Sequence, residues 1–126
     1  MLEQLVDIIS DTSFLIHLAS NTITNLDSIE TEIGDLSFVV PEIVKKAIDH
    51  LPKDPDKNTV VLQTLEYIKN FKTNSIIGAT ADLGILDFVE KNGGIVATMD
   101  RELKTKIKDA GGSVLSMHND KIVLEN

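Results

Sequence analysis

The stretch Gly94-Ile-Val-Ala-Thr-Met-Asp-Arg-Glu-Leu103 decides the fold, because it reads as a short buried strand that runs directly into a helix. Its first four residues are small or apolar and suit a strand covered on both faces. After Asp100, Leu103 and Ile107 lie four residues apart among charged side chains, which predicts a helix with one apolar face. Asp100 therefore stands at a junction between a strand and a helix, and parallel sheets bind their ligands at such junctions.

Strands and helices alternate on both sides of this stretch. We expect further strands at residues 5–10, 36–40, 113–117 and 121–124, the last two paired through a turn at 118–120. Helices are predicted at 14–19, 27–33, 42–50 and 55–71, the last capped by Asp54, and another follows the segment 75–80. This order predicts an α/β fold, a three-layer α/β/α sandwich with a central parallel sheet of four or five strands. We expect a single domain spanning residues 1–126.

Composition excludes several classes of protein. With 12 basic and 20 acidic side chains the formal net charge is −8, which excludes a uniformly basic nucleic-acid coat. An anionic partner would need a local basic patch or a bound cation. The absence of cysteine excludes disulfides, thiolate metal sites and a cysteine nucleophile. No signal peptide or membrane-spanning run is recognisable, so we expect a cytoplasmic protein without a membrane partner.

Three aspartates are predicted to converge at one edge of the sheet. Asp11 follows the first strand, Asp82 lies near the start of a helix, and Asp100 follows the strand quoted above. Taken alone, each is most simply a helix N-cap. Together they would repel one another, by about 1 kcal/mol in water and about 4 kcal/mol at an effective dielectric constant of 20 for a pair near 4 Å. Such a cluster must take up protons, spread apart or hold a cation, and with oxygen ligands alone the suitable ions are Mg²⁺ and Mn²⁺.

Three segments in the same order resemble the motifs of PIN-domain nucleases. They are Asp11-Thr-Ser-Phe-Leu15, Ala81-Asp-Leu-Gly-Ile85 and Val96-Ala-Thr-Met-Asp-Arg-Glu-Leu103, which resemble the first, third and fourth motifs. The segment Gly111-Gly-Ser-Val-Leu115 is similar to the archaeal branch of that family. The resemblance implies a PIN fold and a ribonuclease that depends on Mg²⁺ or Mn²⁺ and hydrolyses RNA phosphodiester bonds.

The resemblance also implies roles for individual residues. Asp11, Asp82 and Asp100 would be the catalytic residues and would hold the metal ion directly or through water. A second group of polar side chains would hydrogen-bond these carboxylates or the waters around the ion, or would serve only as turn and cap residues. This group comprises Thr12, Ser13 and Thr98.

One motif departs from the family pattern. In Pro41-Glu-Ile-Val-Lys-Lys-Ala-Ile48, Ala47 occupies the position of the family's second-motif glutamate. Glu42 is the candidate for an extra acid, but it lies five positions earlier, about 140° around the helix. The alternative function is therefore a non-catalytic PIN module that binds RNA or protein in ribosome assembly or RNA surveillance. A receiver-like domain with an acidic Mg²⁺ pocket ranks lower, because Asp11 has no adjacent acid and no predicted strand ends in lysine.

The expected partner is RNA, single-stranded or structured. Lys45, Lys46 and Lys53, and a second group in residues 101–108, could flank the acidic crevice and contact phosphates, although a solvated helix face is the commoner explanation for such lysines. With one tyrosine and no tryptophan, base stacking is not indicated. The family resemblance further implies a homodimer and, as further partners, an antitoxin or a ribosome-assembly protein.

Overall fold

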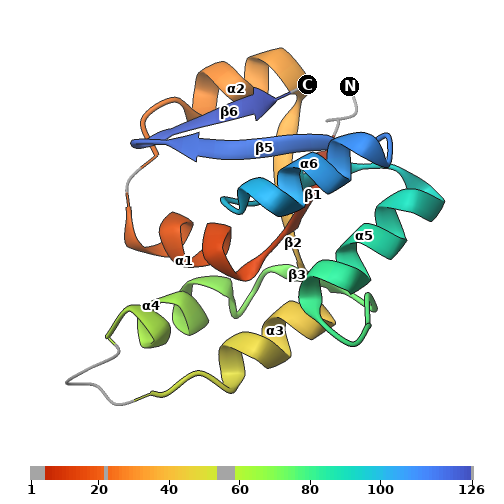
Figure 1. Cartoon of the computed structure of the whole chain (residues 1–126). Coiled ribbons are helices and arrows are strands. Elements are labelled where there is room, and N and C mark those ends of the chain that lie inside the picture. The colour runs from red at the N-terminus through yellow and green to blue at the C-terminus, as the bar shows by residue number, and fades with distance from the viewer. Residues whose placement is uncertain (1–4, 22, 54–58, 126) are drawn as a thin grey trace.

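A computed structural model describes residues 5–21, 23–53 and 59–125 of the chain, and its centre is a six-stranded sheet (Figure 1). The strands are β1 (Leu5–Ser10), β2 (Asp35–Pro41), β3 (Lys72–Asn74), β4 (Ile95–Ala97), β5 (Ser113–His118) and β6 (Lys121–Glu125). The helices are α1 (Thr12–Ser20), α2 (Leu26–Ile33), α3 (Glu42–Asp49), α4 (Thr59–Ile68), α5 (Ala81–Asn92) and α6 (Arg101–Asp109).

The sheet has the strand order β3-β2-β1-β4-β5-β6, so β1 lies near its centre. β1 pairs with β2 and with β4, and all pairings from β3 to β5 are parallel. These five parallel strands confirm the predicted central sheet. The predicted hairpin adds β6 as a sixth strand, which pairs antiparallel with β5.

Two hydrophobic clusters lie on opposite faces of the sheet. Neighbouring strand residues alternate between them: Ile8 belongs to one cluster and Ile9 to the other, as do Leu115 and Val114. Helices α3, α4, α5 and α6 contribute side chains to the cluster around Ile9, α2 contributes to the cluster around Ile8, and α1 contributes to both. The α/β/α sandwich is therefore confirmed.

The sheet contains one strand that the sequence did not suggest and one residue that is unusual in a central strand. The strand before α5 is the short polar β3, and residues 75–80 form the loop that follows it. Asp7, an unusual residue for a central strand, is accommodated because its side chain is exposed, and its carboxylate forms an ion pair of 3.1 Å with Lys72. The predicted cap Asp54 and first helical residue Pro55 lie outside the described residues.

Within the described ranges, no helix has the length and apolar character that crossing a bilayer requires.

Candidate acidic site

A pocket of about 360 Å³ lies where β1 and β4 end. Parallel pairing places the carboxyl ends of both strands on one rim of the sheet, and α5 begins beside them. The pocket is lined by Asp11, Thr12, Ser13, Ala81, Asp82, Met99 and Asp100. The structure thus brings the three aspartates together, as the predicted topology required.

Asp11 is buried and held by three hydrogen bonds. It caps α1 by accepting the backbone N–H of Phe14 at 2.9 Å, and the same oxygen, Oδ1, accepts the Ser13 hydroxyl at 3.0 Å. Its other oxygen, Oδ2, accepts the hydroxyl of the buried residue Thr98. Both carboxylate oxygens are therefore occupied, and the orientation of the side chain is fixed.

Two hydroxyl groups connect Asp11 to the segment that follows β4. The Thr98 hydroxyl accepts the backbone N–H of Asp100 at 3.1 Å, and the Ser13 hydroxyl accepts that of Met99 at 3.4 Å. Thr12 lines the pocket beside them. The polar residues grouped in the sequence analysis therefore surround the carboxylates, and two of them tie the two strand ends together.

Asp100 and Asp82 differ in how far their carboxylates are engaged. Asp100 is exposed and caps α6, with Oδ1 accepting the N–H groups of Glu102 at 2.9 Å and Leu103 at 3.2 Å. Asp82 lies in the first turn of α5, where Thr80 is the cap. Within the described residues, no hydrogen bond engages Asp82 or the second oxygen of Asp100.

The pocket disfavours the charged form of two of its acids. Burial raises the pKa of Asp11, the hydrogen bonds from Thr98, Phe14 and Ser13 oppose this, and the charge of Asp82 adds to it. Loss of solvent also raises the pKa of Asp82, and the charge of Asp100 adds to the increase, whereas Lys106 opposes it. The negative charges of the three aspartates thus act on one another, and a cation would relieve this repulsion.

Comparison with known proteins agrees with this architecture. No protein-family model and no curated protein matches the sequence. Among solved structures, the PIN domain endonuclease Utp24 matches with a TM-score of 0.73 and 23% sequence identity, over 94% of this chain and 90% of that chain. The chain has the PIN-domain fold. In this PIN fold the acidic pocket is built from residues that follow β1 and β4 and from the start of α5.

The donor set of the PIN-fold pocket suits a hydrated divalent cation. In the described part of the chain, no three His, Cys, Asp or Glu side chains lie close enough to hold a metal ion jointly. Mg²⁺, however, usually keeps several waters and takes only one or two protein carboxylates. Asp82 and the second oxygen of Asp100 offer such ligands, and burial together with the charge of Asp100 raises the pKa of Asp82. The residues therefore fit Mg²⁺ or Mn²⁺ held partly through water.

The structure does not bring Glu42 together with the three aspartates. Glu42 forms an ion pair of 3.3 Å with Lys46 and lines a different pocket. Ala47 is exposed on α3 and lines neither pocket. The residues that line the acidic pocket thus include no acid from α3.

The two groups of basic side chains have different surroundings. Lys104 and Lys108 each lie 3.0 Å from Glu125, and Lys106 lies 3.2 Å from Glu102. These ion pairs engage most of the basic side chains of α6. Lys45 and Lys46 line the pocket that contains Glu42. Sequence reasoning did not assign Lys106 an influence on Asp82, since the two are brought together only by the packing of α6 on α5.

Proposed function

We propose that this PIN-fold protein is a ribonuclease that depends on Mg²⁺ or Mn²⁺ and hydrolyses RNA phosphodiester bonds at the acidic pocket. The observation that carries the proposal is that Asp11, Asp82 and Asp100, which come from three separate segments, line one pocket. Two of these carboxyl groups have raised pKa values, as expected of a site that gains from a bound cation. The similarity to a PIN domain endonuclease supports the same class of function.

Each residue has a distinct task in this proposal. Asp82 and Asp100 would hold the ion through their unengaged oxygens, and Asp11 would add a buried negative charge to the same pocket. When bound, the ion would supply Lewis-acid activation for hydrolysis and neutralise charge on the phosphate. Thr98 and Ser13 orient Asp11 and fix the segment 98–100 against it. Thr12, at the pocket wall, would hydrogen-bond water or substrate.

Ala47 supports a second candidate, a non-catalytic PIN module that binds RNA or protein. An exposed alanine, Ala47, stands where the family pattern has an acid. No acidic residue of α3 lines the acidic pocket. RNA is the proposed partner under both candidates. A homodimer and an antitoxin or ribosome-assembly partner stay predictions from the family resemblance.

Calorimetric titration with Mn²⁺ tests the proposal on the wild type and on Asp100→Asn. Asparagine is as good an N-cap as aspartate, so this substitution removes the charge and keeps the cap of α6. We expect binding in the wild type and its loss in the variant. Asp87→Asn, which removes an exposed aspartate paired with Lys91 on the same molecule, is the matched control and should bind like the wild type.

Cleavage of single-stranded and structured RNA by the same three proteins separates the two candidates. Metal-dependent cleavage by the wild type and by Asp87→Asn, but not by Asp100→Asn, supports the nuclease. Binding of RNA without cleavage at any Mn²⁺ concentration supports the non-catalytic module. Mn²⁺ affinity that is unchanged in Asp100→Asn contradicts the assignment of the metal ligands.

A further inference from the structure

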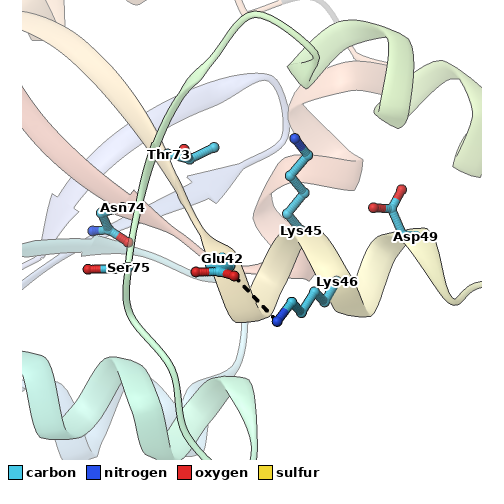
Figure 2. A pocket seen from close by; sticks show the side chains of 7 residues that line it. All are labelled: Glu42, Lys45, Lys46, Asp49, Thr73, Asn74 and Ser75. Carbon is cyan, nitrogen blue, oxygen red and sulfur yellow. Dashed lines mark ion pairs between the residues drawn. The ribbon is translucent and has the colours of Figure 1, made fainter.

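We propose that a second pocket, here called the α3 pocket, binds an unpaired nucleotide of the RNA strand beside the acidic pocket. This proposal rests on the proposed function and names the form of RNA that the site accepts. The α3 pocket has a volume of about 460 Å³, within the range of small-ligand sites, and lies between residues 73–75 at the end of β3 and the length of α3 (Figure 2).

The side chains around the α3 pocket are polar on both sides. The helix contributes Glu42, Lys45, Lys46 and Asp49, and the opposite segment contributes Thr73, Asn74 and Ser75. Figure 2 shows Lys45 and Thr73 extending into the space between the helix and that segment, with Glu42 directed at Lys46. Among the described residues, no aromatic or large apolar side chain lines the pocket. Protein-binding surfaces rely on such side chains as anchors and stacked bases rely on aromatic ones, so the lining favours a nucleotide held by hydrogen bonds and ionic contacts.

Several hydrogen-bond donors of this pocket are unengaged within the described residues, and so is the carboxylate of Asp49. Asn74 uses its carbonyl oxygen to accept the N–H of Ile76 at 3.4 Å, which leaves its amide donors directed elsewhere. Within the described residues, the Lys45 ammonium and the hydroxyls of Thr73 and Ser75 have no hydrogen-bond or ion-pair partner. The Glu42 carboxylate, in contrast, is paired with Lys46. Nucleotides offer the complementary acceptors, namely phosphate oxygens, sugar hydroxyls and base carbonyls.

The α3 pocket and the acidic pocket lie next to each other along the sheet. One is built where β3 and β2 end, the other where β1 and β4 end, and these four strands are consecutive neighbours with parallel pairing. Neighbouring strands lie about 4.8 Å apart, so β2 and β1, which end at the two pockets, end side by side on the rim. In the proposed complex, an RNA strand with a phosphate at the aspartates extends along this rim to the α3 pocket.

The charged side chains that line the two pockets favour the same ligand, an RNA strand. The lining holds two lysines and two acids, so the α3 pocket is formally neutral, whereas the acidic pocket holds three aspartates on a chain of net charge −8. A phosphodiester strand meets least repulsion where the lysines are. A base can enter such a pocket only when it is unpaired, because a duplex keeps its bases stacked inside. Lys45 would contact a phosphate, and Thr73 and Asn74 would contact the sugar or base.

Fluorescence anisotropy with a labelled single-stranded RNA of about ten nucleotides tests the proposal, in EDTA so that binding is measured without metal-dependent cleavage. We expect Lys45→Ala to weaken binding about fivefold and to reduce the slope of log affinity against log salt by about 0.7, the value for one lost contact to a single strand. Asn74→Ala should weaken binding by about threefold to tenfold and leave the slope unchanged. The RNA duplex should bind less tightly than the single strand.

Lys91→Ala and Asn92→Ala are the matched controls, because both residues lie at the end of α5 away from Asp82. Both should bind as the wild type does, and circular dichroism melting should show that all variants are folded. The proposal is overturned if Lys45→Ala matches Lys91→Ala in affinity and in salt slope, if the duplex binds as tightly as the single strand, or if the wild type binds no RNA.

The outcome separates this proposal from the proposed nuclease function. Weakened binding in the α3-pocket variants, with no metal-dependent cleavage by the wild type, retains the nucleotide site and rejects the nuclease. Normal binding in these variants, together with cleavage that is lost in Asp100→Asn, retains the nuclease and rejects the nucleotide site.

Discussion

The Thr98 hydroxyl donates a hydrogen bond to Asp11, and these buried residues are the first to follow β4 and β1. The same hydroxyl accepts the backbone N–H of Asp100. One side chain therefore fixes a buried carboxylate and positions the segment that carries a second one. The link through Thr98 therefore helps to set the positions of Asp11 and Asp100 in the acidic pocket.

Thr98→Val should lower stability and displace Asp100. Valine keeps the shape of threonine but removes both hydrogen bonds, leaving a buried carboxylate oxygen and the Asp100 N–H without their partner. We expect a loss of about 1 to 3 kcal/mol in the free energy of unfolding, measured by urea denaturation, and a further rise in the pKa of Asp11, measured by NMR. Thr105→Val, which removes only an exposed hydroxyl bonded to the Arg101 carbonyl, is the control and should change little. Equal stability of the two variants would contradict the assigned role of Thr98.

Asp82→Asn should change how stability depends on pH in the presence of a chelator. Because the pKa of Asp82 in the folded protein is raised above its ordinary value of 3.8, its contribution to stability is fully present below that pH and is lost as pH rises through the folded pKa. The Asp82→Asn variant has no carboxyl group at this position, so it does not lose this stability as pH rises. The difference in free energy of unfolding, variant minus wild type, should therefore increase between pH 3 and pH 7. A difference that is flat, or that decreases with pH, would show that the ionised Asp82 is not disfavoured in the fold.

Ala47→Glu should strengthen the acidic pocket if the missing acid limits it. Helix α3 packs against both α1 and α5, the two helices that begin at the pocket, so a glutamate on it would add negative charge near the ion. We expect Mn²⁺ affinity to rise roughly tenfold, equivalent to about 1.4 kcal/mol, by calorimetry. Lys46→Glu, one position earlier, tests whether added charge anywhere on α3 has the same effect. Identical affinities for the wild type and Ala47→Glu would show that the three aspartates are sufficient.

Gly84→Ala should disturb the start of α5. A Cβ at this position would lie 2.9 Å from the carbonyl oxygen of Ile77 and 3.2 Å from its carbon, so the helix and the preceding loop would have to separate. We expect a loss of about 1 to 3 kcal/mol in urea denaturation and weaker Mn²⁺ binding, because Asp82 lies in the same turn. Leu83→Ala, at an exposed neighbouring position, should stay within about 0.5 kcal/mol of the wild type. A fully stable Gly84→Ala would mean that this close approach does not position Asp82.

The sequence was most informative where burial imposes a pattern. The apolar strands β1, β4 and β5 and the junction aspartates could be predicted because a two-sided sheet requires apolar strands and parallel crossovers place their ends on one rim. Edge strand β3 could not, since Lys72 and Thr73 are exposed and show no hydrophobic pattern. For the same reason the α3 pocket was not predicted as a unit. Lys45 and Lys46 were identified as basic side chains, but Asn74 meets them only through the pairing of β2 with β3.

The pairing of β1 with β4 also sets when the acidic pocket can exist during synthesis. Asp11 and its partner Thr98 are separated by 87 positions, so their contact requires the closure of a long loop that includes helices α1 to α5 and strands β2 to β4. A chain emerging from the ribosome presents Asp11 early, but it gains Thr98 and Asp100 only after most of the domain has been made. The unfinished chain therefore carries its first acid without the others. The order of the strands thus prevents the acidic pocket from forming before residues 98–100 have been made.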